Sequence, residues 1–281
     1  ATGTGGEIRD RMGGGVGSWP IAGTAVYMTA YPRLDNNTRD WEQIMPVRKW
    51  LYQTPEQILI KASNGASDFG NKFGQPLICG SVLTFEHNED EGDTKYAYDK
   101  VIMLAGGVGY GTKRDCLKGE PKKGNKVVVV GGDNYRIGLG GGSVSSVDTG
   151  RYSNGIELNA VQRANPEMQK RAYNLVRALC EGDENPVVSI HDHGSAGHLN
   201  CLSELVEECG GKIDMTALPI GDKTLSSKEI IANESQERMG LLIDEQHIDE
   251  VRKIAERERA PLYVVGETTG DAHFSFEQGD G

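Results

Sequence analysis

The sequence predicts an α/β (α+β) fold in two parts. Short runs of β-branched residues alternate with stretches of helical periodicity, which is the pattern of helices packed against a sheet. The clearest run, Lys126–Val130, is apolar enough for a strand buried on both faces. A polar run rich in lysine and glycine precedes it, so composition predicts a first domain of residues 1–121 and a second of residues 122–281.

The first part is expected to combine a glycine-rich opening with strands and helices. Thr54 is a suitable helix N-cap and Pro55 suits the first helical position, so a helix should begin here and end at Gly65. The stretches 32–48 and 87–99 are expected to be loops. The other expected elements are a short charged helix at 7–12 and strands at 21–31, 76–85 and 100–105.

The second part repeats a strand and helix rhythm more regularly. Asn165 and Pro166 open a helix with one apolar face, which Gly182 should end. Ser226 and Glu229 have the spacing of a capping box at another helix start. The remaining expected elements are helices at 199–209 and 245–259 and strands at 187–190, 238–243, 261–265 and 273–276.

Composition excludes several classes of protein. The net charge of -11 disfavours a nucleic-acid surface, which is normally basic, although a locally positive site for an anion remains possible. No apolar run approaches the roughly 18 residues of a membrane span. The 5 cysteines form no CxxC pair, as expected of reduced thiols. We therefore expect a cytoplasmic protein.

The opening segment is the first candidate for chemistry. Gly3, Gly5 and Gly6 precede the expected helix, where free N–H groups and the helix dipole favour an anion. Arg9 could form a forked contact with a phosphate or carboxylate, and Asp10 could hold a magnesium ion that bridges phosphates. The alternative is a flexible terminus followed by a surface ion pair.

The glycine-rich loop 131–142 is the second candidate. Its last glycines, Gly140, Gly141 and Gly142, could cradle a phosphate after a strand. The dinucleotide fingerprint fails because its third glycine would be Ser143, and no Walker loop is present. The alternative is a tight turn that needs glycine.

Two polar segments complete the candidates. Asp192 follows an apolar strand and could bind a hard cation, although His191 and His193 keep a zinc site open as an alternative. Glu234, Ser235 and Gln236 could bind a ribose or an amide through paired donors and acceptors. A solvated loop is the alternative for both segments.

Six segments, in this order, resemble phosphoribosylformylglycinamidine synthase of the large type. No single segment is decisive, but the GLGGG-x-x-SS, VQR-x-NPEM and NESQER runs are specific together. The resemblance covers essentially the whole chain. The segments are 3–10, 71–76, 131–146, 161–168, 190–194 and 233–238.

This resemblance implies a fold like that of aminoimidazole ribonucleotide synthetase. The first domain would be a partial N-domain, which pairs with a partner to form a shared barrel, and the second would be an α/β sandwich. The full enzyme is one long chain with two such halves and a C-terminal glutaminase. We therefore expect the rest of that enzyme as partner, a possible homodimer of this segment, and no activity from the segment alone.

The implied reaction uses ATP and magnesium to convert formylglycinamide ribonucleotide into an amidine. ATP phosphorylates the substrate amide oxygen, and ammonia from glutamine then displaces phosphate. By position, Asp10 and Asp192 would bind magnesium, and Gly3, Gly5 and Gly6 would lie along ATP, with Gly140 to Gly142 as a less specific phosphate contact. The expected substrate contacts are Arg9, Gln162, Glu234, Ser235 and Gln236.

Two departures from the family pattern qualify the resemblance. Ala196 stands where relatives have glycine, and His198 stands where they have an apolar residue, so the backbone path of this loop is open. The catalytic residues are expected upstream of this segment. Another ATP-dependent synthetase of the same fold, or a non-catalytic scaffold, remains the alternative.

Overall fold

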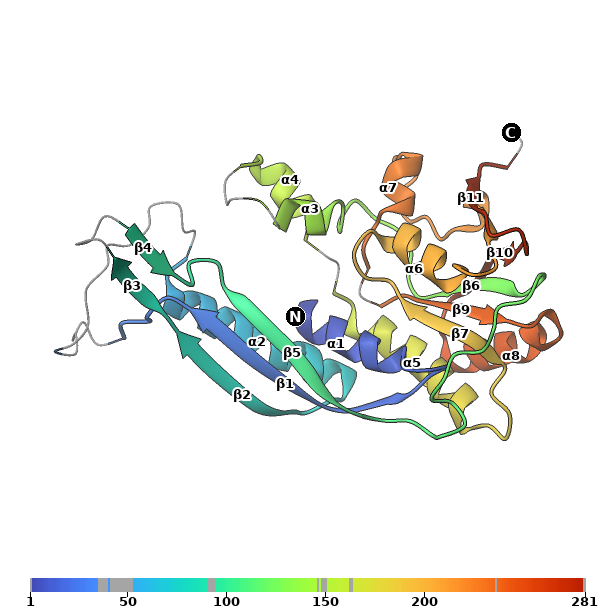
Figure 1. The fold of residues 1–281 in the computed structure, drawn as a ribbon, viewed down its shortest axis with the longest axis horizontal. Coiled ribbons are helices and arrows are strands. Elements are labelled where there is room, and N and C mark those ends of the chain that lie inside the picture. Colours follow the sequence, from blue (N-terminus) through green and yellow to red (C-terminus); the bar gives the residue numbers. More distant parts are fainter. Residues whose placement is uncertain are drawn as a thin grey trace.

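The computed structural model describes residues 2–34, 40, 53–89, 94–145, 147, 151–161, 164–235 and 237–279. Two sheets with their helices lie side by side along the long axis of the molecule (Figure 1). The expected α/β architecture is confirmed, with a three-stranded sheet in the first part and a six-stranded sheet in the second.

The three-stranded sheet has the order β2-β1-β5, with β1 parallel to β2 and antiparallel to β5. Alternate residues of β1, among them Ala25 and Tyr27, are buried against helix α2. The elements of this part are α1 Thr2–Met12, β1 Trp19–Thr29, α2 Pro55–Phe73, β2 Leu77–Thr84, β3 Glu86–Glu89, β4 Thr94–Ala97 and β5 Ile102–Tyr110.

Three local predictions for this part are wrong. Helix α2 begins at the predicted Thr54 cap but continues through Gly65, because its buried residues Ala66, Phe69 and Phe73 keep contact with the core. It ends at Gly74, which has a φ of 93°. A β3–β4 hairpin occupies the expected loop 87–99, and the expected helix at 7–12 starts already at Thr2. The expected loop 32–48 lies largely outside the described residues.

The six-stranded sheet has the order β11-β8-β10-β6-β9-β7. Five of its strands, and the capping box at Ser226, match expected elements, whereas β8 was not predicted. The elements are β6 Lys126–Val130, α3 Gly141–Ser145, α4 Asn154–Asn159, α5 Pro166–Glu181, β7 Val187–Asp192, α6 Gly197–Leu205, β8 Gly211–Asp214, α7 Ser227–Ile231, β9 Met239–Ile243, α8 Ile248–Glu258, β10 Leu262–Thr268 and β11 Phe274–Glu277.

Both faces of this sheet are covered, as the unbroken apolar run of β6 predicts. Val128 and Val130 belong to a core shared with α5 and α8, whereas Val127 and Val129 belong to a core shared with α6. All four valines are fully buried.

Helix α1 joins the two parts. Its Ile8 and Met12 are fully buried in the core formed with α5 and the six-stranded sheet. Its Arg11 side chain instead donates to the Val108 carbonyl of β5 at 2.5 Å and to Gln75 Oε1 at 2.7 Å. Helix α1 is therefore attached to the first part through Arg11 and places Arg9 and Asp10 beside the second part.

Helices of the described segments are too short or too polar to traverse a lipid bilayer.

Candidate functional site

The expected site residues converge on one edge of the six-stranded sheet. Met239, the first residue of β9, pairs with Val130 at the end of β6 and with Asp192 at the end of β7. The carboxyl ends of β6 and β7 therefore meet at the same edge. The loop after each strand, the 233–238 segment and the middle of α1 all reach this edge.

Arg9 and Asp192 form the charged centre of this edge. Arg9 Nε lies 3.4 Å from Asp192 Oδ2, and the Arg9 side chain is only 4% exposed. Burial lowers the pKa of Arg9, while the Asp192 and Asp10 carboxylates oppose that shift. A buried cation needs a paired anion, so Asp192 stabilises the charge of Arg9.

Asp10 is the second carboxylate and lies at the exposed rim of the edge. Its pKa is raised, first by partial burial and then by the negative charge of Asp192. Arg9 only partly offsets this repulsion. Two carboxylates that repel each other in this way form an environment that a divalent cation would stabilise.

Glu234 and Ser235 reach the same edge but are buried, at 3% and 1% exposed. Glu234 Oε1 accepts a hydrogen bond from the Ala196 N–H at 3.2 Å, and Ser235 Oγ donates to Asn233 Oδ1 at 3.2 Å. Glu234 also bonds through its backbone N–H to the Gly138 carbonyl. These residues connect the loops after β6 and β7.

The glycines are placed differently from the prediction. Gly3, Gly5 and Gly6 do not form a loop before a helix but lie within α1 itself. The N–H groups of a first helical turn still lack intrahelical partners. Gly5 is buried, and its carbonyl accepts from the Gln169 side chain at 3.0 Å.

The second glycine group is also partly helical. Gly140, with a φ of 67°, precedes α3, which contains Gly141 and Gly142. A Cβ on Gly142 would lie 2.8 Å from Ser195 Oγ, so this turn packs against the loop after β7. Gln162 and Gln236, two expected substrate contacts, lie outside the described residues.

The alternative of a shared zinc site at His191 and His193 is wrong for the described part of the chain. The two rings have separate partners: His191 contacts Glu204, and His193 bonds to His198. Across the described ranges, no group of three or more His, Cys, Asp or Glu side chains could hold a metal.

A buried polar cluster behind the edge escaped the sequence analysis. His193, His198 and Arg238 are each 0% exposed, whereas His193 was expected in an ordinary loop. Burial lowers the pKa of both histidines well below the usual value, so both are neutral at physiological pH. The sequence feature that could have revealed this cluster is His198, a polar residue at a position where relatives have an apolar one.

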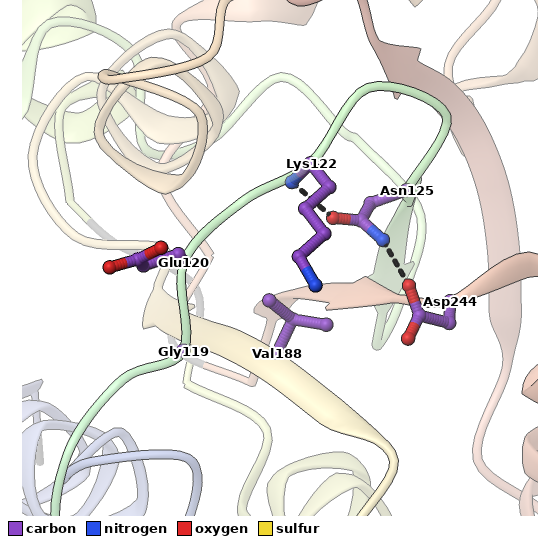
Figure 2. A pocket seen from close by; sticks show the side chains of 6 residues that line it. All are labelled: Gly119, Glu120, Lys122, Asn125, Val188 and Asp244. Carbon is purple, nitrogen blue, oxygen red and sulfur yellow. Dashed lines mark hydrogen bonds between the residues drawn. The ribbon is translucent and has the colours of Figure 1, made fainter.

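A separate cavity lies at the opposite edge of the sheet. It has a volume of about 360 Å³ and is lined by residues before β6, at the start of β7 and after β9 (Figure 2). Its Asn125 side chain accepts from the Lys122 N–H at 2.6 Å and donates to Asp244. None of the expected site residues lines this cavity.

Comparison with known proteins confirms the resemblance. The chain is 40% identical to a probable phosphoribosylformylglycinamidine synthase, chloroplastic/mitochondrial, of Arabidopsis thaliana over 96% of its length, and 38% identical to the Homo sapiens phosphoribosylformylglycinamidine synthase over 96%. These matches cover 19% and 20% of the relatives. The chain thus spans about a fifth of the length of the curated relatives it matches.

Solved structures share the fold at lower identity. T. maritima PurL complexed with FGAR has a TM-score of 0.71 at 22% identity, covering 99% of this chain and 40% of that one. A HypE-HypF complex has a TM-score of 0.65 at 13% identity, covering 99% and 81%. The fold alone therefore does not separate these two kinds of protein, whereas sequence identity favours the synthase.

The model for the C-terminal domain of AIR synthase related proteins matches residues 122–278, which is more than half of the chain. The matched residues carry Asp192 and the 233–238 segment of the site edge. The chain belongs to the family of AIR synthase related proteins.

Proposed function

We propose that the chain is a segment of a phosphoribosylformylglycinamidine synthase, with a partial N-domain at 1–121 and the C-terminal domain of the same half at 122–281. The meeting of Arg9, Asp10 and Asp192 at one sheet edge carries this proposal. The identity of about 40% to synthases across 96% of the chain supports it. The proposed substrates are formylglycinamide ribonucleotide, ATP and glutamine, and the product is the amidine.

The donor set fits a magnesium ion that arrives with ATP. Magnesium is usually held by one or two carboxylates together with phosphate oxygens and water, and Asp10 and Asp192 offer two carboxylates at one edge. Partial burial and then the Asp192 charge raise the Asp10 pKa, and a cation at this edge would relieve the repulsion between the two carboxylates. When bound, magnesium would neutralise phosphate charge during phosphoryl transfer.

The protein side chains orient the substrates and compensate their charge. Arg9 supplies a fixed positive charge beside Asp192, suited to an anionic ribonucleotide. Glu234, Ser235, Gln236 and Gln162 are the proposed contacts to its polar groups. Because Glu234 and Ser235 are buried, their contacts require the loops at 131–142 and 193–197 to separate from them.

The glycines are proposed to bind ATP phosphates through backbone N–H groups. Gly3 lies in the first turn of α1, where N–H groups without intrahelical partners favour an anion, and Gly5 and Gly6 follow it in the same helix. Gly140, Gly141 and Gly142 enter α3 at the same sheet edge and are the second proposed contact.

The remaining domains of the synthase, including the glutaminase, are the proposed partners. The fold shared with T. maritima PurLQS, at a TM-score of 0.64, supports partners from the rest of such an enzyme. A homodimer through the three-stranded sheet is proposed for the chain in isolation. A cytoplasmic location is proposed from the 5 free cysteines.

The decisive experiment uses the full-length protein that carries this chain. Purified protein is incubated with ATP, magnesium, glutamine and formylglycinamide ribonucleotide, and ADP and the amidine are quantified. ADP release that depends on the ribonucleotide is expected. ATP hydrolysis indifferent to the ribonucleotide, or no hydrolysis, would refute the proposal.

A further inference from the structure

A continuous chain of hydrogen bonds runs behind the site edge through three buried side chains. Arg238 Nη1 lies 2.9 Å from His198 Nε2, and His198 Nδ1 lies 2.9 Å from His193 Nε2. The two imidazole rings meet edge to face, with centroids 4.8 Å apart. We call these three residues the relay.

The Arg238 guanidinium determines which ring nitrogen carries the proton in each of the two histidines. A guanidinium only donates, so His198 Nε2 must accept from Arg238. A neutral imidazole has one donor and one acceptor, so His198 Nδ1 carries its proton and donates to His193 Nε2. The direction of each bond, and the tautomer of both rings, therefore follow from Arg238.

The relay also links the segments that build the site. His193 follows Asp192 directly, and its N–H donates to the Arg238 carbonyl at 3.1 Å. The Arg238 guanidinium donates to Asn134 in the loop after β6 and to Asn233 in the 233–238 segment. The backbone directly after Asp192 is thus tied to both neighbouring loops.

We propose that His193 and His198 are positioning residues that hold the Asp192 carboxylate in the orientation needed for magnesium and ATP. This inference rests on the proposed function and adds two residues that do not contact the ligand themselves. Partners that orient a metal-binding side chain typically change metal affinity or activity by about 10–100-fold when removed. Disruption of the relay should therefore raise the magnesium concentration that gives the half-maximal rate.

Two substitutions at one position separate positioning from stability. The amide of His193→Gln extends to the place of Nε2 and can accept from His198, whereas the shorter amide of His193→Asn cannot reach it. Thr268→Val is the control for lost stability, because Thr268 is 2% exposed and bonds to the Lys122 carbonyl at the opposite edge.

The experiment measures ribonucleotide-dependent ADP formation against magnesium concentration in the full-length protein, with the melting temperature of each variant. His193→Asn should raise the magnesium concentration for half-maximal rate by about tenfold or more. His193→Gln should restore most of that loss, and Thr268→Val should lower only the melting temperature. If His193→Asn does not fold, His198→Gln replaces it, since it keeps the acceptor for Arg238 but lacks the Nδ1–H donor.

An unchanged magnesium requirement in the folded variant would overturn the inference. So would failure of both His193→Asn and His198→Gln to fold where Thr268→Val folds, because the relay would then serve stability alone. Wild-type protein without ribonucleotide-dependent turnover would instead refute the proposed function.

Discussion

Asp192 stands between a buried cation and a second carboxylate. Its charge compensates Arg9, whose side chain is 4% exposed, and at the same time raises the pKa of Asp10. The balance of positive and negative charge at this edge of the sheet therefore depends on the Asp192 carboxylate. A neutral side chain at position 192 would remove its repulsion of the Asp10 carboxylate, but it would leave the positive charge of Arg9 less well compensated.

Asp192→Asn in the full-length protein should retain the fold, because the two side chains have nearly the same size. It should cut turnover heavily and weaken magnesium-dependent use of ATP, since one of two candidate carboxylate ligands is lost. Steady-state rates against magnesium concentration test this. Asp68→Asn is the control, because Asp68 is exposed on α2. Equal effects of both substitutions would contradict the assignment.

Ala196 stands where the family pattern has glycine and adopts a backbone conformation that glycine favours. It has a φ of 61°, a conformation that favours glycine, and it directly precedes α6. Its N–H donates to Glu234 Oε1. This bond and the adjacent Gly197 hold the strained conformation in place.

Glycines in the loop after β6 differ in what surrounds them, and this gives a prediction at the scale of the element. Gly138 and Gly140 both have positive φ values, 73° and 67°. A Cβ on Gly138 would lie 2.1 Å from the Glu234 carbonyl oxygen, whereas the nearest atom to one on Gly140 is 4.0 Å away.

Gly140→Ala in the 281-residue chain should therefore cost about 1–2 kcal/mol of unfolding free energy, from backbone strain alone. Gly138→Ala should cost distinctly more, because the 233–235 segment must also shift. Urea unfolding of both variants measures the difference. If the two costs are equal, the tight contact at Gly138 does not hold in solution.

Helix α2 begins with a reciprocal cap between Thr54 and Gln57. Thr54→Ala removes the side-chain acceptor of the Gln57 N–H and should destabilise the chain by about 0.5–2 kcal/mol. Urea unfolding tests this, with Ser67→Ala as the control, since Ser67 is exposed and lies within the same helix. A cost below that of the control would contradict a role for the cap.

At the scale of the whole molecule, the two sheets differ in how they are covered. The six-stranded sheet is buried on both faces, but the three-stranded sheet has one face with large exposed apolar side chains. The large apolar side chains on this face include Leu83, Leu104 and Val108, which are 49%, 53% and 54% exposed. Their neighbours on β1 are Met28, Val26 and Ala22, which alternate along the strand with residues that face α2. Exposed apolar surface of this kind favours association.

The isolated chain should therefore self-associate at micromolar concentration. Leu104→Lys should shift it toward a monomer, because a charge would be buried in the contact. Leu117→Lys is the matched control, because Leu117 is 78% exposed but lies in the connection between the two sheets. Sedimentation velocity of all three proteins tests this, and a monomeric wild-type chain would contradict it.

The isolated chain should also form no amidine from formylglycinamide ribonucleotide, with either glutamine or ammonia. It corresponds to about a fifth of the relatives that carry the whole reaction. Product analysis after incubation with ATP and magnesium tests this. Turnover by the chain alone would mean that it contains every catalytic residue.

The sequence by itself determined the α/β class, the strands and helices of the second part except β8, α3 and α4, and the helix caps at Thr54, Asn165 and Ser226. These features depend on residues close together in the chain. The sequence also identified Arg9, Asp10 and Asp192 as candidates, but not that α1 spans both sheets and brings them to one edge.

Only the tertiary structure decided the roles of residues whose partners are distant in sequence. Helix α2 passes Gly65 because packing against the core outweighs the preference of glycine to end helices. Arg238 and His198 are separated by 40 residues, so no local pattern could pair them. A histidine in a glycine-rich loop looks solvated in sequence, and its burial depends on the approach of the 233–238 segment to the end of β7.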